Sequence, residues 1–224
     1  MSKARKASFG IVLMVALAGV MAAAAYALDI NGTPGNDRIV GSVNDDNINA
    51  QAGDDRVFAR AGNDTVNADD GDDFVSGGPG DDHITGHKGN DRLLGRVGND
   101  YINGLYDDDV IRGMAGDDTL IGDYPEVGDL ESTDTIFGGP GNDSIAGGDA
   151  ADFLVGGSGL DTISGQDGDD RIRAVDGEVD QISCGNGNDR AAVDSVDVIT
   201  DGSCERIAVV TTQPAPEPTA TPVS

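Results

Sequence analysis

A nine-residue pattern of polar and apolar positions repeats along most of the chain. It is clearest from Gly77 to Leu94, where two consecutive lines read GGPGDDHIT and GHKGNDRLL. Each line starts with a glycine-rich turn, has an aspartate at position 6 and an aliphatic residue at position 8, and is mixed at positions 7 and 9. A three-residue strand whose middle side chain points into a core, while both neighbours point outward, has this pattern.

The aspartate at position 6 allows the repeat to be followed through 17 lines. Ten lines keep a strict period of nine, seven residues are then inserted within residues 122–133, and the period slips by one residue before Asp180. Position 8 is a branched aliphatic residue in 16 of the 17 lines, Ala191 being the exception. The pattern predicts a solenoid of very short strands and no helices, with the insertion as a surface loop.

Glycine occupies position 4 in 12 of the 17 lines, where a tight turn requires a backbone conformation closed to most other residues. Some lines depart from this pattern, and we expect distorted or empty ion sites there. Position 1 is alanine in three lines, at Ala50, Ala59 and Ala68. Position 4 is not glycine in other lines, as at Asn44, Asp107 and Ala150.

The charge of the chain favours cations as its partners. There are 41 acidic residues against 14 basic ones, a net charge of -27, which argues against nucleic acid or an anionic membrane surface as the natural partner. Acidic turns stacked about 5 Å apart would repel one another by roughly 3 kcal/mol per neighbouring pair at an effective dielectric constant of about 20. A disordered acidic chain is the alternative to a solenoid, and a folded solenoid needs counter-ions.

Calcium is the counter-ion that the residues favour. Carboxylates and main-chain carbonyls are hard oxygen ligands, and they suit Ca²⁺ at a coordination number of six to eight. A soft metal is disfavoured because the chain has two Cys and two His without clustered thiolates. We therefore predict several Ca²⁺ ions bound at the turns.

The two ends of the chain differ from the repeats. Residues 1–27 have three basic residues, an apolar run and the small residues Ala25 and Ala27, which predicts a secretory signal peptide cut after Ala27. A retained membrane anchor is the alternative, but the apolar run is short for a membrane span. Cleavage would leave 11 basic residues against the 41 acidic ones and no membrane span in the mature chain. Residues 211–224 hold four Pro and predict a disordered tail.

The lines GGPGDDHIT, GGPGNDSIA at Gly138 and GGSGLDTIS at Gly156 resemble the GGxGxDxUx nonapeptide of the repeats-in-toxin (RTX), or haemolysin-type, calcium-binding proteins. The resemblance implies a parallel β-roll over residues 28–192, with two nonapeptides per coil and turns that alternate between two edges. It also implies that each Ca²⁺ lies between turns two lines apart, held by turn carbonyls and by position-6 carboxylates. The implied metal ligands are Asp37, Asp46, Asp55, Asp64, Asp73, Asp82, Asp91, Asp100, Asp109, Asp118, Asp134, Asp143, Asp152, Asp161, Asp170, Asp180 and Asp189.

The segment after the repeats, residues 193–210, is expected to close the open end of the roll. Cys184 and Cys204 in an exported chain predict a disulfide that fixes this cap, with free thiols as the alternative. Such a loop contributes about 3 kcal/mol to stability. The insertion also contains Glu126 and Asp129, so an additional ion site is an alternative to a plain surface loop.

The sequence contains no recognisable catalytic motif. His83 and His87 have the spacing of a helical zinc pair, but they lie in a turn context without an adjacent Glu. The acidic pairs recur in every turn, whereas catalysis needs one asymmetric site. We expect a secreted or cell-surface calcium-binding structural or interaction module that folds on binding calcium and is not an enzyme, with an envelope component or another protein as its partner. A secreted hydrolase with RTX repeats and a cell-surface adhesin are the alternatives.

Overall fold

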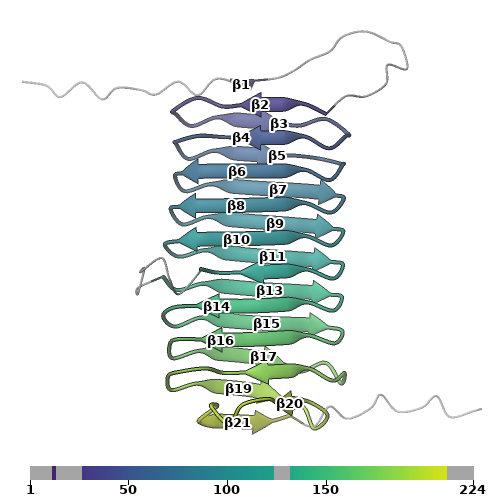
Figure 1. Cartoon of the computed structure of the whole chain (residues 1–224), viewed down its shortest axis with the longest axis vertical. Coiled ribbons are helices and arrows are strands. Elements are labelled where there is room, and N and C mark those ends of the chain that lie inside the picture. The colour runs from purple at the N-terminus through teal and green to yellow at the C-terminus, as the bar shows by residue number, and fades with distance from the viewer. Residues whose placement is uncertain (1–11, 14–26, 124–131, 211–224) are drawn as a thin grey trace, which may run out of the picture.

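The computed structural model describes residues 12–13, 27–123 and 132–210. In this part of the chain the fold is a parallel β-solenoid of about ten turns with two strands per coil, and it contains no helix (Figure 1). The strands form two sheets that face each other across the solenoid, sheet A with 11 strands and sheet B with 10. The predicted fold class, an all-β parallel β-roll with two lines per coil, is confirmed.

The odd-numbered strands form sheet A and the even-numbered strands form sheet B. Sheet A consists of β1 (Val12–Leu13), β3 (Arg38–Val40), β5 (Arg56–Phe58), β7 (Phe74–Pro79), β9 (Arg92–Val97), β11 (Val110–Ala115), β13 (Thr135–Pro140), β15 (Phe153–Ser158), β17 (Arg171–Ala174), β19 (Arg190–Val193) and β21 (Arg206–Val209). Sheet B consists of β2 (Asp29–Asn31), β4 (Asn47–Asn49), β6 (Thr65–Asp70), β8 (His83–Lys88), β10 (Tyr101–Tyr106), β12 (Thr119–Ile121), β14 (Ser144–Gly148), β16 (Thr162–Gln166), β18 (Gln181–Ser183) and β20 (Val198–Ile199).

The 17 predicted lines correspond one to one with strands β3 to β19. Neighbouring strands within a sheet are parallel and pair residues 18 positions apart, as Ile84 pairs with Ile102. Across the insertion the register is kept, because Ile111 pairs with Ile136. The sheets are therefore continuous across the insertion, and residues 124–131, with the acidic side chains Glu126 and Asp129, lie outside the described residues.

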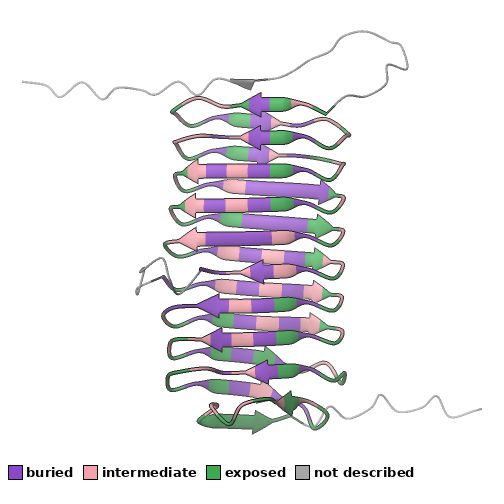
Figure 2. Cartoon of the chain, viewed as in Figure 1, coloured by how far each residue is buried: buried purple, intermediate pink, exposed green. Residues whose placement is uncertain are grey.

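The core is a column of position-8 side chains between the two sheets. Figure 2 shows that buried residues recur in the strands along the roll. All 17 of these side chains are buried, from Ile39 at one end to Ala191 at the other. Ala50, Ala59 and Ala68, which replace glycine at position 1, are also fully buried and join the same cluster. Alternation along each short strand thus decides which residues fill the roll, since successive side chains point to opposite faces.

The turns contain two left-handed residues where the sequence predicted one. At position 4, Gly98 has φ = 133°, and a Cβ built on it would lie 2.1 Å from the carbonyl oxygen of Gly80 in the preceding coil. In most lines position 2 is left-handed as well, even where it is not glycine, as at Arg60 (φ 89°) and His87 (φ 86°). The sequence did not predict the left-handed conformation at position 2, because many residue types occupy that position.

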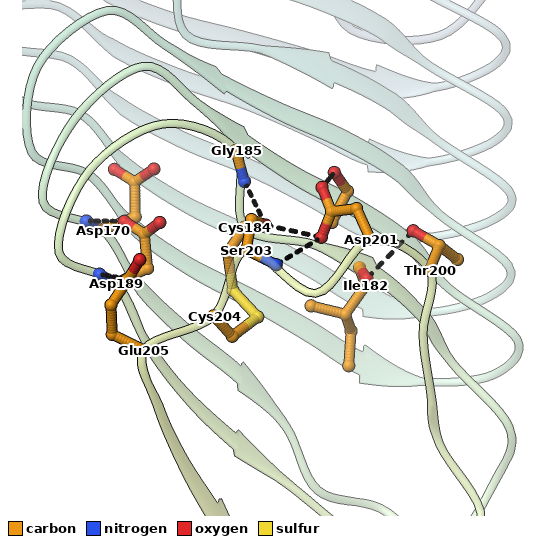
Figure 3. Close-up of a disulfide and its surroundings, with 11 residues drawn as sticks. Asp170, Ile182, Cys184, Gly185, Asp189, Thr200, Asp201, Ser203, Cys204 and Glu205 are labelled. Atoms are coloured by element: carbon orange, nitrogen blue, oxygen red, sulfur yellow. Dashed lines mark hydrogen bonds between the residues drawn. A yellow bond between two sulfur atoms is a disulfide. The ribbon is translucent and has the colours of Figure 1, made fainter.

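The sheets continue past residue 192, where the repeats were predicted to end. Strands β20 and β21 extend sheet B and sheet A by one strand each, and β21 pairs in parallel with β19. A disulfide between Cys184 and Cys204 joins this closing segment to the roll, with the two Cα atoms 5.2 Å apart (Figure 3). The predicted disulfide is therefore present.

The predicted tail, residues 211–224, and the predicted signal peptide, apart from Val12, Leu13 and Ala27, lie outside the described residues. Among the residues that the structure describes, no helix has the length and apolar character needed to cross a membrane.

Candidate metal centre

The position-6 aspartates form two columns, one along each edge of the roll, because consecutive lines turn at opposite edges (Figure 1). The sheet A column precedes the strands of sheet A and contains Asp37, Asp55, Asp73, Asp91, Asp109, Asp134, Asp152, Asp170 and Asp189. The sheet B column precedes the strands of sheet B and contains Asp46, Asp64, Asp82, Asp100, Asp118, Asp143, Asp161 and Asp180. All 17 aspartates are buried.

Hydrogen bonds connect the aspartates of each column into a ladder. From Asp55 onward, Oδ1 of each aspartate accepts the main-chain N–H of the aspartate one coil earlier, as Asp64 N–H donates to Asp82 at 2.9 Å. The ladder also spans the insertion, where Asp109 N–H donates to Asp134 at 2.8 Å. These bonds fix the orientation of every carboxylate, so the second oxygen, Oδ2, points in the same direction in each coil.

In most of the ladder Oδ2 is buried and accepts no hydrogen bond from the described residues. At Gly77 and Gly95, the position-1 glycines of two lines, a Cβ would lie 2.1 Å from the Oδ2 of the aspartate five residues on. A buried carboxylate oxygen without a partner is costly, so it marks a place where a cation or a proton is required. The residues with such an Oδ2 include Asp55, Asp64, Asp73, Asp82, Asp91, Asp100, Asp109, Asp118, Asp143, Asp152, Asp161, Asp170, Asp180 and Asp189.

Burial and mutual repulsion favour the protonated form of these carboxyl groups. Burial, together with the charges of Asp91 and Asp134, raises the pKa of Asp109 to about 10. Burial likewise raises the pKa of Asp152 to about 9 and that of Asp73 to about 8. At neutral pH the ladder therefore holds carboxylates that can ionise at low cost only if positive charge is supplied beside them.

The first two turns of the roll differ from the rest. Oδ2 of Asp37 accepts hydrogen bonds from the N–H and the hydroxyl of Thr33, at 2.6 and 2.9 Å. Asp46 is bonded through both oxygens, by the N–H and hydroxyl of Ser42 and by the N–H of Leu28. Asp46 therefore has less capacity for a cation than the aspartates from Asp55 onward, whereas Asp37 keeps one buried oxygen, Oδ1, without a hydrogen-bond partner.

A second ladder runs outside the first and in the opposite direction. Here the position-5 side chain accepts the N–H of the position-5 residue one coil later, as Asp81 N–H donates to Asn63 at 3.0 Å. Beside the sheet B column the position-5 residues alternate between Asp and Asn: Asp45, Asn63, Asp81, Asn99, Asp117 and Asn142. The alternation separates the exposed charges by two coils, which reduces their repulsion. The sequence analysis missed this alternation, which appears only when every second line is compared.

The inner ladder continues into the closing segment through two residues that the sequence analysis missed. Asp180 N–H donates to Asp197 at 3.1 Å. Asp189 N–H donates to Oε2 of Glu205 at 2.7 Å (Figure 3). Asp197 and Glu205 are each followed by an outward-facing residue and then by an aliphatic residue, as a position-6 aspartate is. The nine-residue period could not reveal them, because the spacing from Asp189 to Asp197 and from Asp197 to Glu205 is eight.

The donor set of the turns is suited to a hard cation. In the described part of the chain, no three His, Cys, Asp or Glu side chains gather at one point, so a bound ion would draw most of its ligands from main-chain carbonyls. Carboxylate and carbonyl oxygens are the ligands that Ca²⁺ prefers. His83 stacks on Tyr101 with ring centroids 4.6 Å apart, which gives it a role in the outer face of sheet B.

Comparison with known proteins identifies the repeat. The family model of the RTX calcium-binding nonapeptide repeat matches the chain at residues 31–66, 67–102, 94–123, 131–163, 146–178 and 155–191. These matches cover well over half of the chain and coincide with strands β3 to β19. No curated protein matches the chain.

Proposed function

Because the chain belongs to the RTX calcium-binding nonapeptide repeat family, we propose that it is an exported protein that binds several Ca²⁺ ions along its two aspartate columns and folds on binding them. It acts as a structural or interaction module and has no catalytic site of its own. The bound ions supply the positive charge that the stacked acidic turns require.

The buried, unpaired Oδ2 atoms carry this proposal. They recur in the same orientation from turn to turn, from Asp55 to Asp118 and from Asp143 to Asp189. One proton per carboxyl group would also relieve the burial, but at neutral pH a divalent cation neutralises two carboxylates and binds turn carbonyls as well. The residues that would hold calcium are these aspartates together with the carbonyl groups of the glycine-rich turns.

Coupling of folding to calcium follows from the same arrangement. The aspartates of one column are brought together only when the coils stack, so the unfolded chain has no preformed site. Without cations, like charges in neighbouring coils oppose stacking. Export fits this requirement, because weak calcium sites are typical of extracellular modules, which work at millimolar calcium.

Circular dichroism during a calcium titration of the full chain tests this function. We expect a coil spectrum in chelator at pH 8 and a strand spectrum at millimolar Ca²⁺, with Mg²⁺ much less effective because it needs a smaller, more regular octahedral site. A spectrum that does not respond to calcium would falsify the proposal. Esterase and protease assays of the calcium-loaded protein test the alternative of a hydrolase, and activity that survives purification would support it.

A further inference from the structure

The basic residues of this acidic protein are gathered on one face. All ten arginines after residue 27 belong to sheet A: nine lie on its strands and Arg60 lies in the turn that follows β5. Sheet B has a single basic residue, Lys88, which is paired with Asp70 at 3.5 Å. The arginines of sheet A are Arg38, Arg56, Arg60, Arg92, Arg96, Arg112, Arg171, Arg173, Arg190 and Arg206.

The outer surface of sheet A carries no acidic residue. From β3 to β21, its outward positions 7 and 9 hold arginine, phenylalanine, small aliphatic residues, leucine, serine and threonine. On sheet B the same positions, from β4 to β18, are mainly Asn, Thr and Ser, and none is Asp, Glu, Lys or Arg. The roll thus has a cationic face, a neutral polar face and two acidic edges.

Phenylalanine and arginine form the same arrangement twice on sheet A. The guanidinium of Arg38 lies 5.0 Å from the ring centroid of Phe58, and Phe58 packs against Phe74 at 5.6 Å. Four coils further on, Arg112 lies 5.0 Å from Phe137, and Phe137 packs against Phe153 at 6.0 Å. Each phenylalanine pair is followed in register by a further arginine, Arg92 or Arg171.

The C-terminal half of this face contains a shallow groove. It is lined by Phe153, Arg171, Arg173, Arg190 and Arg206, and it continues toward the adjacent turns, where Asp169 and Asp170 lie. Arg171, Arg190 and Arg206 are direct partners in neighbouring strands. Their side chains are exposed, and in the described part of the chain no ion pair involves any of them.

Three like charges in register on neighbouring strands destabilise a sheet. The chain has 41 acidic residues, yet it places none between these arginines. The acidic residues at the rim of the groove have other partners: Glu205 accepts the N–H of Asp189 and Asp169 accepts the N–H of Asn188. An unbalanced arginine row of this kind is suited to an anionic ligand, since guanidinium groups bind carboxylates with two parallel hydrogen bonds.

We propose that the outer face of sheet A, centred on the groove at Phe153, Arg171, Arg190 and Arg206, binds a linear polysaccharide that carries carboxylate groups. Parallel strands are spaced about 4.8 Å apart, and a sugar ring in an extended polysaccharide advances by close to that length. The sugars along the roll axis can therefore stay in step with the arginine row, while the exposed phenylalanine ring packs against the apolar face of a sugar. This inference rests on the proposed function only in that calcium folds the roll.

The same features disfavour the other polyanions. Phosphates of duplex DNA advance by about 3.4 Å per strand along the helix axis and would fall out of step with the arginines. The acidic edges on both sides of the face would also repel a ligand of such high charge density. A carboxylate polysaccharide has a lower charge density and can lie between the two edges.

Binding is tested with the full chain at saturating calcium and a fluorescent oligomer of β-1,4-linked uronic acid as the probe. The variant Arg171→Gln/Arg190→Gln/Arg206→Gln removes three positive charges from the groove. The matched control Ser144→Glu/Thr162→Glu/Gln181→Glu changes the net charge by the same amount at three exposed, registered positions of sheet B. Circular dichroism in calcium establishes that both variants are folded, and it separates failure of the proposed function from failure of this inference.

We expect the Kd for the oligomer to rise about tenfold or more for each arginine removed, and to change by less than about threefold in the control. The oligomer with its carboxylates reduced to alcohols is expected not to bind. Absence of binding to a folded roll would overturn the inference. Equal losses in the two variants would do so as well, because they indicate net charge alone, and so would stronger binding to a single-stranded DNA oligomer or to phosphatidylglycerol vesicles.

Discussion

The main-chain N–H of Asp82 donates to Oδ1 of Asp100 at 2.8 Å, whereas Oδ2 of the same carboxyl group is buried without a hydrogen-bond partner. In most of the ladder, one oxygen of the aspartate thus stabilises the stack, and the other is left for a cation. The two roles can be separated by mutation, because an asparagine keeps the first oxygen and replaces the second with an NH₂ group.

Asp82→Asn is expected to weaken calcium binding while retaining the ladder hydrogen bond. The variant loses a charged oxygen at the site, and we expect the calcium concentration at half-maximal folding to rise about 10- to 100-fold, the range found for perturbed metal sites. The matched control is Asp81→Asn, one residue earlier. The Asp81 side chain is exposed, and its Oδ1 accepts the N–H of Asn99. Calorimetric calcium titrations that show equal effects for the two variants would contradict a special role for the inner ladder.

The calcium-free roll is expected to be more stable in mild acid than in base. Burial raises the pKa of Asp73 to about 8 and that of Asp82 to about 7 from the ordinary value of 3.8, so the folded state binds more protons than the unfolded state. The stabilisation is fully present below about pH 4 and is lost as the pH rises through about 7 to 8. In chelator, the strand content measured by circular dichroism should therefore be higher at pH 5 than at pH 8.

Calcium should reverse this pH dependence. Protons and calcium compete for the same carboxylates, so the calcium-loaded protein should lose affinity for the ion as the pH falls, and binding should release protons. Calorimetry in buffers of different ionisation enthalpy measures that release. A chelated protein that gains strand structure as the pH rises from 5 to 8 would contradict the effect of burial on the ladder.

Gly98→Ala is expected to destabilise the calcium-loaded roll by about 2–3 kcal/mol, because the residue has positive φ and a close carbonyl neighbour. The new Cβ would meet the carbonyl oxygen of Gly80 at 2.1 Å. Gly202→Ala is the control, since no atom lies within 4 Å of a Cβ at that position. Denaturant unfolding at fixed calcium measures the stability of both variants. If Gly98→Ala leaves the stability unchanged, neighbouring turns can move apart without loss of stability.

Loss of the disulfide is expected to act locally. Cys184→Ser/Cys204→Ser removes a link across a sequence separation of 20, which stabilises by about 3 kcal/mol. Because a coil contacts only its neighbours, hydrogen exchange should increase mainly in β18 to β21 and much less near β8. Uniformly faster exchange along the roll would instead show that the closing segment controls the stability of the whole solenoid.

Much of the fold was determined by the sequence alone. One aliphatic residue occurs in every nine, between two outward-facing positions. This pattern requires short strands that each bury the aliphatic side chain, and strands β3 to β19 have this arrangement in every line. The positions of the 17 aspartates, the insertion and the slip before Asp180 were likewise fixed by spacing. These properties are local, since each depends on residues within one nonapeptide.

The tertiary structure decided what depends on contacts between coils. The sequence could not show that Asp46 is bonded through both oxygens, nor that Asp197 and Glu205 extend the ladder out of period, because these facts arise from hydrogen bonds between residues 16 to 18 positions apart. Along the sequence, position 7 is occupied by a mixture of residue types. Only the assignment of alternate lines to opposite sheets separates that mixture into an arginine face and a neutral face, because neighbours in space are two lines apart in the chain.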